Sequence, residues 1–207
     1  MKRPAAVKTR NFEKSRKEIL KVAFWEVFVH GFNGVSIDDI VAKTSLTKGA
    51  FYHHFPTKLD LGYVLVDEVL KPLIMERWIT PLNAFKNPLD GVLLQMQKLI
   101  GECPPDLLKY GCPLNNLVQE MAPIDPGFKK RLTAVLNLWI DRLDEHLIRA
   151  QTEGYLKSEM STREVAHFIV MAHEGFYGLL KGLGSPGIYP VLSRSMGLYF
   201  QTISANG

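Results

Sequence analysis

The stretch from Ser36 to Lys58 gathers small, polar, aromatic and basic side chains where a short helix would expose them. Thr47 can cap that helix through its hydroxyl, and Phe51 and Phe55 lie one turn apart, so both rings would face inward. The outer face then carries no carboxylate and consists of Lys48, Gly49, Ala50, Tyr52, His53 and His54. Such side chains suit phosphates and base edges, which predicts a helix that enters the major groove of DNA.

A second short helix is predicted immediately before the first. Ser36 can cap it, and Asp39 supplies the acidic partner of a capping box three residues later. Ile37, Ile40 and Val41 fall on one face, the spacing of a helix that packs against a core. Two polar residues then break the pattern before Thr47, so the sequence predicts two helices joined by a tight turn.

These helices and their flanks resemble the helix-turn-helix of the TetR family of transcriptional regulators. The resemblance covers roughly residues 12–66 and includes the gap-free order T-K-G-x-F-Y-x-H-F-x-x-K. An ordinary helical hairpin would share the hydrophobic pattern but would not require this order. The matching residues are Gly31, Phe32, Gly34, Ser36, Ile40, Ala42, Thr47, Lys48, Gly49, Phe51, Tyr52, His54, Phe55, Pro56, Thr57, Lys58 and Leu61.

The resemblance implies roles for individual DNA-binding residues. Phosphates would be held by Ser36, Tyr52, His54 and Lys58, with His53 as a further candidate. Base edges would be faced by Thr47, Lys48, Gly49 and Ala50. Lys48 could donate to guanine, and the methyl group of Ala50 could contact thymine. In a homodimer the two recognition helices would sit about 34–36 Å apart, so the partner is expected to be a pseudo-palindromic operator in double-stranded DNA.

The charge distribution agrees with a DNA-binding segment at the N-terminus. The 207 residues are 46% hydrophobic and 22% charged, which is ordinary for a soluble globular protein. Residues 1–60 carry 11 Lys/Arg against 6 Asp/Glu, whereas residues 61–207 carry 14 against 15. Residues 1–10 hold four basic residues and no acidic one, and they are either a disordered tail or an arm that follows the phosphate backbone.

The compartment is expected to be the cytoplasm, and no membrane partner is expected. Two cysteines are too few for a disulfide framework. No uncharged apolar run approaches the roughly 18 residues that a membrane span needs. The basic N-terminus lacks the apolar segment of a signal peptide.

The periodicity predicts an all-α fold with about nine helices. Residues 1–57 are expected to form a helix-turn-helix DNA-binding domain of three helices, the first beginning near Phe12. Residues 58–207 are expected to form a helical ligand-binding and dimerisation domain. The family resemblance makes the helix from Lys58 the connecting helix, and Pro72 is expected to kink or end it near Lys71. A broken stretch should follow before a helix from Pro88.

Residue patterns typical of enzymes and metal sites are missing from the sequence. It has no Cys-x-x-Cys, no His-x-x-x-His, no nucleophile elbow and no phosphate-binding glycine loop. His53 and His54 are adjacent, which places their side chains about 100° apart on a helix. His167, His173 and Glu174 share one helix and are interpreted as core or interface residues. We therefore expect no catalytic residue, no metal and no resident cofactor.

Cys112 lies at the predicted start of a helix, in the segment Gly111–Leu117. The segment resembles a motif in the regulatory domains of one branch of the TetR family, some of whose members sense electrophiles or oxidants. A helix N-terminus favours a thiolate, so Cys112 could be a sensor with Cys103 as its resolving partner. Alternatively, Cys112 is a small apolar residue that fills the core.

The effector is expected to be a small molecule of unknown identity. Aromatic and polar residues that could line its pocket are Trp78, Phe85, Tyr110, Cys112, Asn116, Glu120, Trp139, Phe176 and Tyr177. Small and apolar residues on the last two helices predict a homodimer interface that includes Ala172, Gly175, Leu179, Leu198 and Tyr199. The predicted function is a dimeric repressor released from its operator by the effector. The alternatives are a thiol sensor that acts through Cys112 and an activator with the same DNA-binding head.

Overall fold

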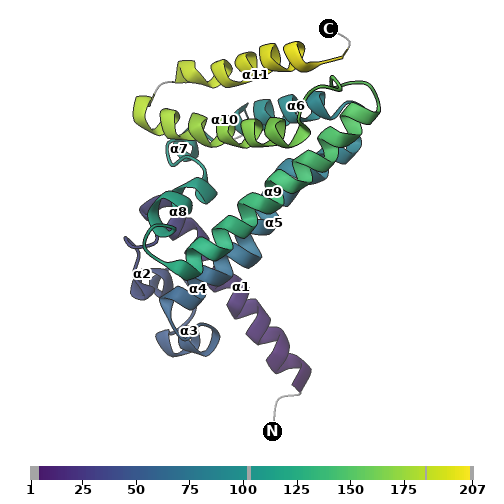
Figure 1. Ribbon diagram of the computed structural model, residues 1–207. Helices are drawn as coiled ribbons and strands as arrows, with labels where there is room; N and C mark the ends of the chain where they lie inside the picture. Colours follow the sequence, from purple (N-terminus) through teal and green to yellow (C-terminus); the bar gives the residue numbers. More distant parts are fainter. Residues whose placement is uncertain (1–4, 102–103, 185, 206–207) are drawn as a thin grey trace. The chain divides into compact units, whose positions relative to one another are not determined.

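The computed structural model describes residues 5–101, 104–184 and 186–205, and these residues form an all-α fold (Figure 1). In the described residues nine α-helices are six residues or longer, and an isolated bridge between Leu156 and Ser204 is the nearest approach to a β-strand. The nine are α1 (Ala5–His30), α2 (Ile37–Ala42), α3 (Lys48–His54), α4 (Lys58–Val64), α6 (Pro88–Gly101), α8 (Pro113–Met121), α9 (Pro126–Thr152), α10 (Thr162–Leu183) and α11 (Tyr189–Ile203). The predicted fold class is confirmed.

The described chain divides into two compact units. The first, called the head unit here, comprises the described residues up to Lys71 together with Asn116–Leu132. The second, the C-terminal unit, comprises Pro72–Asn115 and the described residues from Thr133 onward. The domain division predicted at residue 57 stays a prediction. Among the described residues, a helix long and apolar enough to cross a bilayer is not found.

The helix ends of the head unit follow the predicted capping chemistry. Ser36 and Asp39 form the full capping box of α2, and Thr47 caps α3 by accepting from the backbone N–H of Ala50. Gly31 ends α1 in the left-handed conformation, with φ of 79°. α1 itself begins at Ala5 rather than near Phe12, because the residues that precede Phe12 are compatible with a helix and extend it.

The chain does not leave the helical conformation at Pro72, so the predicted end of the connecting helix was wrong. After α4 come a π-helix (η1, Leu65–Leu70), α5 (Lys71–Ile74), a second π-helix (η2, Met75–Ile79) and a 3₁₀-helix (η3, Thr80–Ala84). A proline cannot donate to the carbonyl four residues earlier, and its ring crowds that carbonyl. A widened π turn next to Pro72 changes this hydrogen-bond register, so the helix continues.

Each unit buries an apolar core of its own. The head core includes Ile19, Ala23, Val27, Phe32, Ile40, Phe51, Phe55, Leu61, Leu65 and Phe128. The C-terminal core includes Trp78, Leu82, Leu89, Val92, Met96, Trp139, Leu143, Leu147, Ile169, Phe176, Leu180, Met196 and Phe200. Within the C-terminal unit α11 lies against both α6 and α10 (Figure 1). The short helices α7 (Pro105–Leu108) and η4 (Pro186–Ile188) complete this unit.

Candidate nucleic-acid interface

The helix α3 is anchored by two aromatic rings, and the opposite face is left in solvent. Phe51 is fully buried and Phe55 is 2% exposed, whereas the Tyr52 ring between them is 46% exposed. A Cβ atom added to Gly49 would meet only the Thr47 hydroxyl oxygen, at 3.9 Å, among the described residues. The exposed residues of this face are Thr47, Lys48, Gly49, Tyr52 and His53, and Ala50 is half-buried. The face can therefore approach a flat or grooved surface closely.

Lys48 reaches back to α2 in the free protein. Its Nζ lies 2.7 Å from a carboxylate oxygen of Asp38, and this hydrogen bond raises the pKa of Lys48. Both side chains are more than half exposed, so the ion pair adds little stability and can be exchanged for a base edge.

An acidic residue of α1 holds the turn between α2 and α3. The Glu18 carboxylate accepts from the backbone N–H of Ser45 at 2.6 Å and from its hydroxyl at 3.1 Å. These bonds, the backbone one first, lower the pKa of Glu18. Glu18 and Ser45 are 27 positions apart, and no local sequence pattern links them, so this contact was not predicted.

Three of the predicted phosphate ligands already have partners in the head unit. The His54 Nε2 atom lies 2.7 Å from the Ser15 hydroxyl of α1, and burial followed by the charge of Arg16 lowers the pKa of His54. The Ser36 hydroxyl donates to Asp39 at 2.6 Å. Lys58 places its ammonium 4.7 Å from the centroid of the Phe32 ring, and burial lowers its pKa. Their phosphate contacts stay predictions.

Glu120 and Asn116, predicted for the effector pocket, belong to the head unit. The Glu120 carboxylate accepts from the backbone N–H groups of Phe32 and Asn33, both at 2.8 Å. It thereby satisfies two amides of the turn that follows α1, whose Gly31 lies against the same carboxylate. Glu120 thus ties α8 to the turn that leads into the helix-turn-helix.

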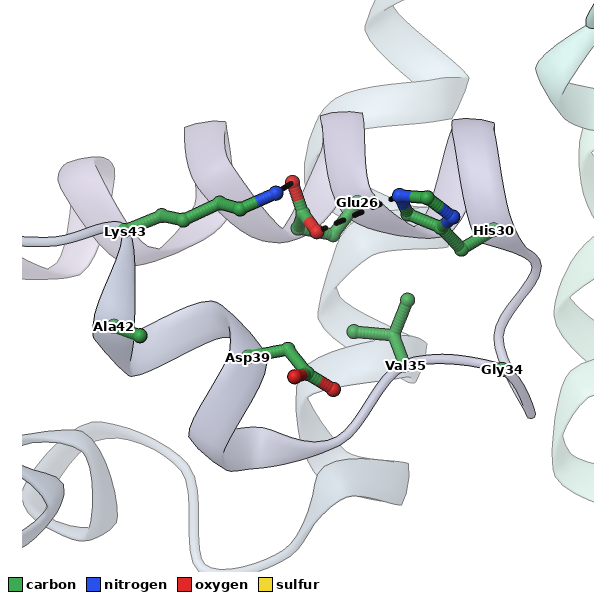
Figure 2. A pocket seen from close by; sticks show the side chains of 7 residues that line it. All are labelled: Glu26, His30, Gly34, Val35, Asp39, Ala42 and Lys43. Carbon is green, nitrogen blue, oxygen red and sulfur yellow. Dashed lines mark hydrogen bonds and ion pairs between the residues drawn. The ribbon is translucent and has the colours of Figure 1, made fainter.

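A hollow of about 320 Å³ lies beside the same turn (Figure 2). Its lining residues are Glu26, His30, Gly34, Val35, Asp39, Ala42 and Lys43. Figure 2 shows Lys43 and His30 approaching the Glu26 carboxylate from two sides, at 2.7 and 4.0 Å. The residues predicted for the effector pocket do not line this hollow. The ion pair between Lys43 and Glu26 joins the end of α2 to α1.

Most of the remaining predicted pocket residues surround His173 in the C-terminal unit. The Trp78 and Trp139 rings are buried, and their centroids lie 4.6 and 5.3 Å from that of His173. Tyr177 lies 4.8 Å away, and Phe176 packs against Tyr177. Phe85 and Tyr110 are half-buried in the same unit. The structure thus brings several of the predicted residues together around His173, which was not among them. Their role in effector binding stays a prediction.

Cys112 is buried beside the same histidine. Its Sγ donates to the Glu174 carboxylate at 3.4 Å, and the Sγ, a His173 ring nitrogen and a Glu174 oxygen all lie within 4.8 Å of one another. The backbone N–H groups of Asn115 and Leu114 favour the thiolate, as predicted for a helix N-terminus. Burial and the neighbouring Glu174 outweigh them and raise the pKa of Cys112 well above its ordinary value. Cys103, its predicted resolving partner, lies outside the described residues.

Burial also shifts the pKa values of the two α10 residues in this cluster. Burial raises the pKa of Glu174 to about 7, and the hydrogen bond from Cys112 opposes that shift. Burial lowers the pKa of His173 to about 3. At neutral pH the cluster therefore contains a neutral imidazole and a neutral thiol.

The residues predicted for the dimer interface lie on α10 and α11 and are exposed or half-buried. Leu179 is 58% exposed and Leu198 is 65% exposed, and Gly175 is exposed beside them. Ala172 and Tyr199 are half-buried. Further exposed apolar side chains of the two helices are Phe168, Met171, Leu183 and Val191. The two helices thus leave apolar side chains in solvent.

Comparison with known proteins agrees with this architecture. A family described as bacterial regulatory proteins, tetR family, matches residues 19–61, and one described as the tetracyclin repressor-like C-terminal domain matches residues 96–196. The chain is 26% identical over 171 residues to an uncharacterized HTH-type transcriptional regulator in the lacX 3' region of Lactococcus lactis subsp. lactis, which covers 83% of this chain and 85% of that protein.

Two further similarities concern a named repressor and a solved fold. The HTH-type transcriptional repressor DhaR of Mycobacterium sp. (strain GP1) is 23% identical over 151 residues, covering 72% of this chain and 74% of that protein. A TetR-family regulator from Cytophaga hutchinsonii has a TM-score of 0.82 at 17% identity, covering 94% of this chain and 96% of that chain. Together with the capped helices α2 and α3, the two family matches show that this chain belongs to the tetR family of bacterial helix-turn-helix transcriptional regulators.

Proposed function

We propose that this chain is a dimeric repressor that leaves a two-fold symmetric operator when a small molecule binds its C-terminal unit. The single observation that carries the proposal is the solvent-facing side of α3, which is free of carboxylates, small at Gly49 and basic at Lys48. Thr47, Lys48, Gly49 and Ala50 face base edges in this proposal, and Tyr52 and Lys58 hold phosphates. Each protomer contributes one α3 to one half-site.

The homodimer forms through α10 and α11 in this proposal. The exposed apolar side chains of these helices support a self-complementary interface, because a monomer would leave them in water. Two heads spaced by a fixed interface require two half-sites about 34–36 Å apart or a multiple of that distance.

The effector binds in the C-terminal unit among the aromatic residues around His173. Trp78, Trp139 and Tyr177 offer apolar surface there, and Glu174 offers a polar atom. The effector can weaken operator binding only to the extent that it binds the state that cannot bind DNA more tightly than the state that can.

Operator selection from a random duplex library, read at two salt concentrations, tests the DNA-binding proposal. A two-fold symmetric site and an affinity that falls steeply with salt are expected. Tyr52→Phe and Lys58→Ala should weaken binding to all sequences, and Lys58→Ala should also reduce the salt slope by about one. Sequence-independent binding would overturn the proposal. A metabolite screen for release of the selected operator then tests repression by an effector, and binding that every ligand leaves unchanged would contradict that part.

A further inference from the structure

Three donor atoms of different chemistry meet inside the C-terminal unit. Cys112 immediately precedes α8, and His173 and Glu174 are neighbours on α10. The Cys112 Sγ lies 3.4 Å from the Glu174 Oε1, and the His173 Nε2 lies 3.7 Å from the same oxygen. The three donor atoms, one from each residue, all lie within 4.8 Å of one another. Cys112 and Glu174 of α10 are 62 positions apart in the sequence, so no metal site was predicted from their spacing.

The two separations from the Glu174 oxygen are close to the donor spacing of a tetrahedral metal site. With metal–sulfur, metal–nitrogen and metal–oxygen bonds of about 2.3, 2.0 and 2.0 Å, tetrahedral donors lie about 3.3–3.6 Å apart. Two observed separations are within a few tenths of an ångström of that range, so side-chain rotation can bring the donors onto one ion. Sulfur, imidazole and carboxylate together form a donor set that zinc accepts.

A divalent ion would also match the charge of the sulfur and carboxylate donors once both are deprotonated. A thiolate and a carboxylate together carry two negative charges, which a divalent cation would neutralise inside the protein, where unpaired charge is costly. The Glu174 Oε2 atom is buried without a hydrogen-bond partner among the described residues. A buried carboxylate oxygen normally has a partner, and a bound cation would provide one.

The surroundings hold the three donors in place. The His173 ring packs edge-on against the rings of Trp78, Trp139 and Tyr177. The Asn115 side-chain amide donates to the backbone carbonyl of Glu174 at 3.1 Å, which ties the first turn of α8 to α10. A positioned shell of this kind reduces the cost of arranging ligands around an ion.

We propose that Cys112, His173 and Glu174 bind one divalent metal ion of the Zn²⁺ class. The thiol proton of Cys112 and any proton on Glu174 pass to solvent when the ion binds. Three protein ligands leave a fourth position for water or for a donor atom of a small molecule. The site requires neither DNA binding nor a dimer, but it uses His173 and Glu174, which also belong to the proposed effector site.

Cobalt titration of the untagged, chelator-stripped full-length chain tests the site. The background variant is Cys103→Ser, so any thiolate-to-cobalt charge-transfer band must come from Cys112. One Co²⁺ per chain and a band that Zn²⁺ abolishes by displacement are expected. Cys112→Ser should remove the band. Glu174→Gln and His173→Gln should each weaken Co²⁺ binding by at least about tenfold, since each loses a ligand.

The matched control is His167→Gln, which alters an exposed histidine of the same helix whose Nδ1 contacts the Arg163 carbonyl. It should leave the band and the affinity unchanged. Glu174→Gln keeps the shape of the side chain, so its helical circular dichroism should stay native and a lost metal can be read separately from a lost fold. A missing band, or equal binding by the Glu174→Gln and background chains, would overturn the proposal. Loss of the metal with intact operator binding would leave the proposed function standing.

Discussion

The Glu120 carboxylate makes two charged hydrogen bonds to the turn that precedes the helix-turn-helix. A hydrogen bond to a charged group contributes about 1.5–3 kcal/mol, and truncation also leaves two amides without partners. We expect Glu120→Ala to lower the free energy of unfolding by about 2–3 kcal/mol, as measured by urea denaturation. Glu120→Gln can still accept one of the two hydrogen bonds, so its free energy of unfolding should lie between those of the parent and the alanine variant. A loss below about 0.5 kcal/mol in the alanine variant would show that water replaces the carboxylate.

Substitutions of Lys48 and of Asp38 should have opposite effects on DNA binding. Lys48→Ala should lower selectivity for the preferred base by about 1–3 kcal/mol and leave the melting temperature unchanged, since the exposed pair adds little stability. Asp38→Asn should instead tighten operator binding, because it frees the lysine from its partner. Fluorescence anisotropy with operator and single-base variants measures both effects. Equal selectivity of the lysine variant and the parent would remove Lys48 from the base contacts.

The stability of the head unit should depend on pH through Glu18 and Asp39. Hydrogen bonds from Ser45 and Ser36 lower the pKa values of these carboxyl groups in the folded chain below their ordinary values of about 4.3 and 3.9. The unfolded chain therefore binds more protons in this range. The resulting stability is complete above the ordinary values and is lost as the pH falls through the lowered ones. Melting curves between pH 7 and pH 3 should show a shallower acid decline for Glu18→Gln than for the parent.

At the scale of elements, α4 packs against its neighbours through a glycine. A Cβ atom on Gly62 would lie 2.5 Å from the Phe128 ring and 2.6 Å from the Phe32 ring. Both rings are buried and cannot retreat into solvent. We expect Gly62→Ala to destabilise the chain by about 1–3 kcal/mol in denaturant titration. Adding Phe128→Leu should relieve the overlap, so the double variant should lose less than the sum of the single losses. Additive losses would mean that the Phe128 ring does not clash with the added methyl group.

The ends of the helices show which local rules were sufficient to predict the structure. Ser36, Thr47 and Gly31 act through bonds to residues within one helical turn, so their roles could be predicted from the sequence. The helix end expected at Pro72 was wrong because it rested on a local rule alone. Pro72 was expected to kink or end the helix near Lys71, whereas the chain continues through π turns on both sides of it. Which register a helix adopts depends on its packing, and a proline alone does not specify it.

At the scale of the whole molecule, dimerisation and operator affinity should be lost together. Leu179→Glu and Leu198→Glu place a charge on the apolar surface of α10 and α11, so sedimentation velocity should report monomers. Operator affinity should fall at least about tenfold, since one head then meets one half-site. Ile148→Glu alters a side chain that is 50% exposed on α9, outside this surface, and should remain dimeric. If all three variants remained dimeric, the dimer interface would have to lie on another surface.

The sequence by itself determined the family, the all-α fold, the caps of α2 and α3 and the exposed face of α3. These features depend on residues a few positions apart, where periodicity and capping chemistry act. Only the tertiary structure joined Glu18 to Ser45, Glu120 to Phe32 and Cys112 to Glu174, pairs separated by 27, 88 and 62 positions. Such contacts depend on how whole helices pack, and helix packing is set by the summed fit of many side chains rather than by a local pattern.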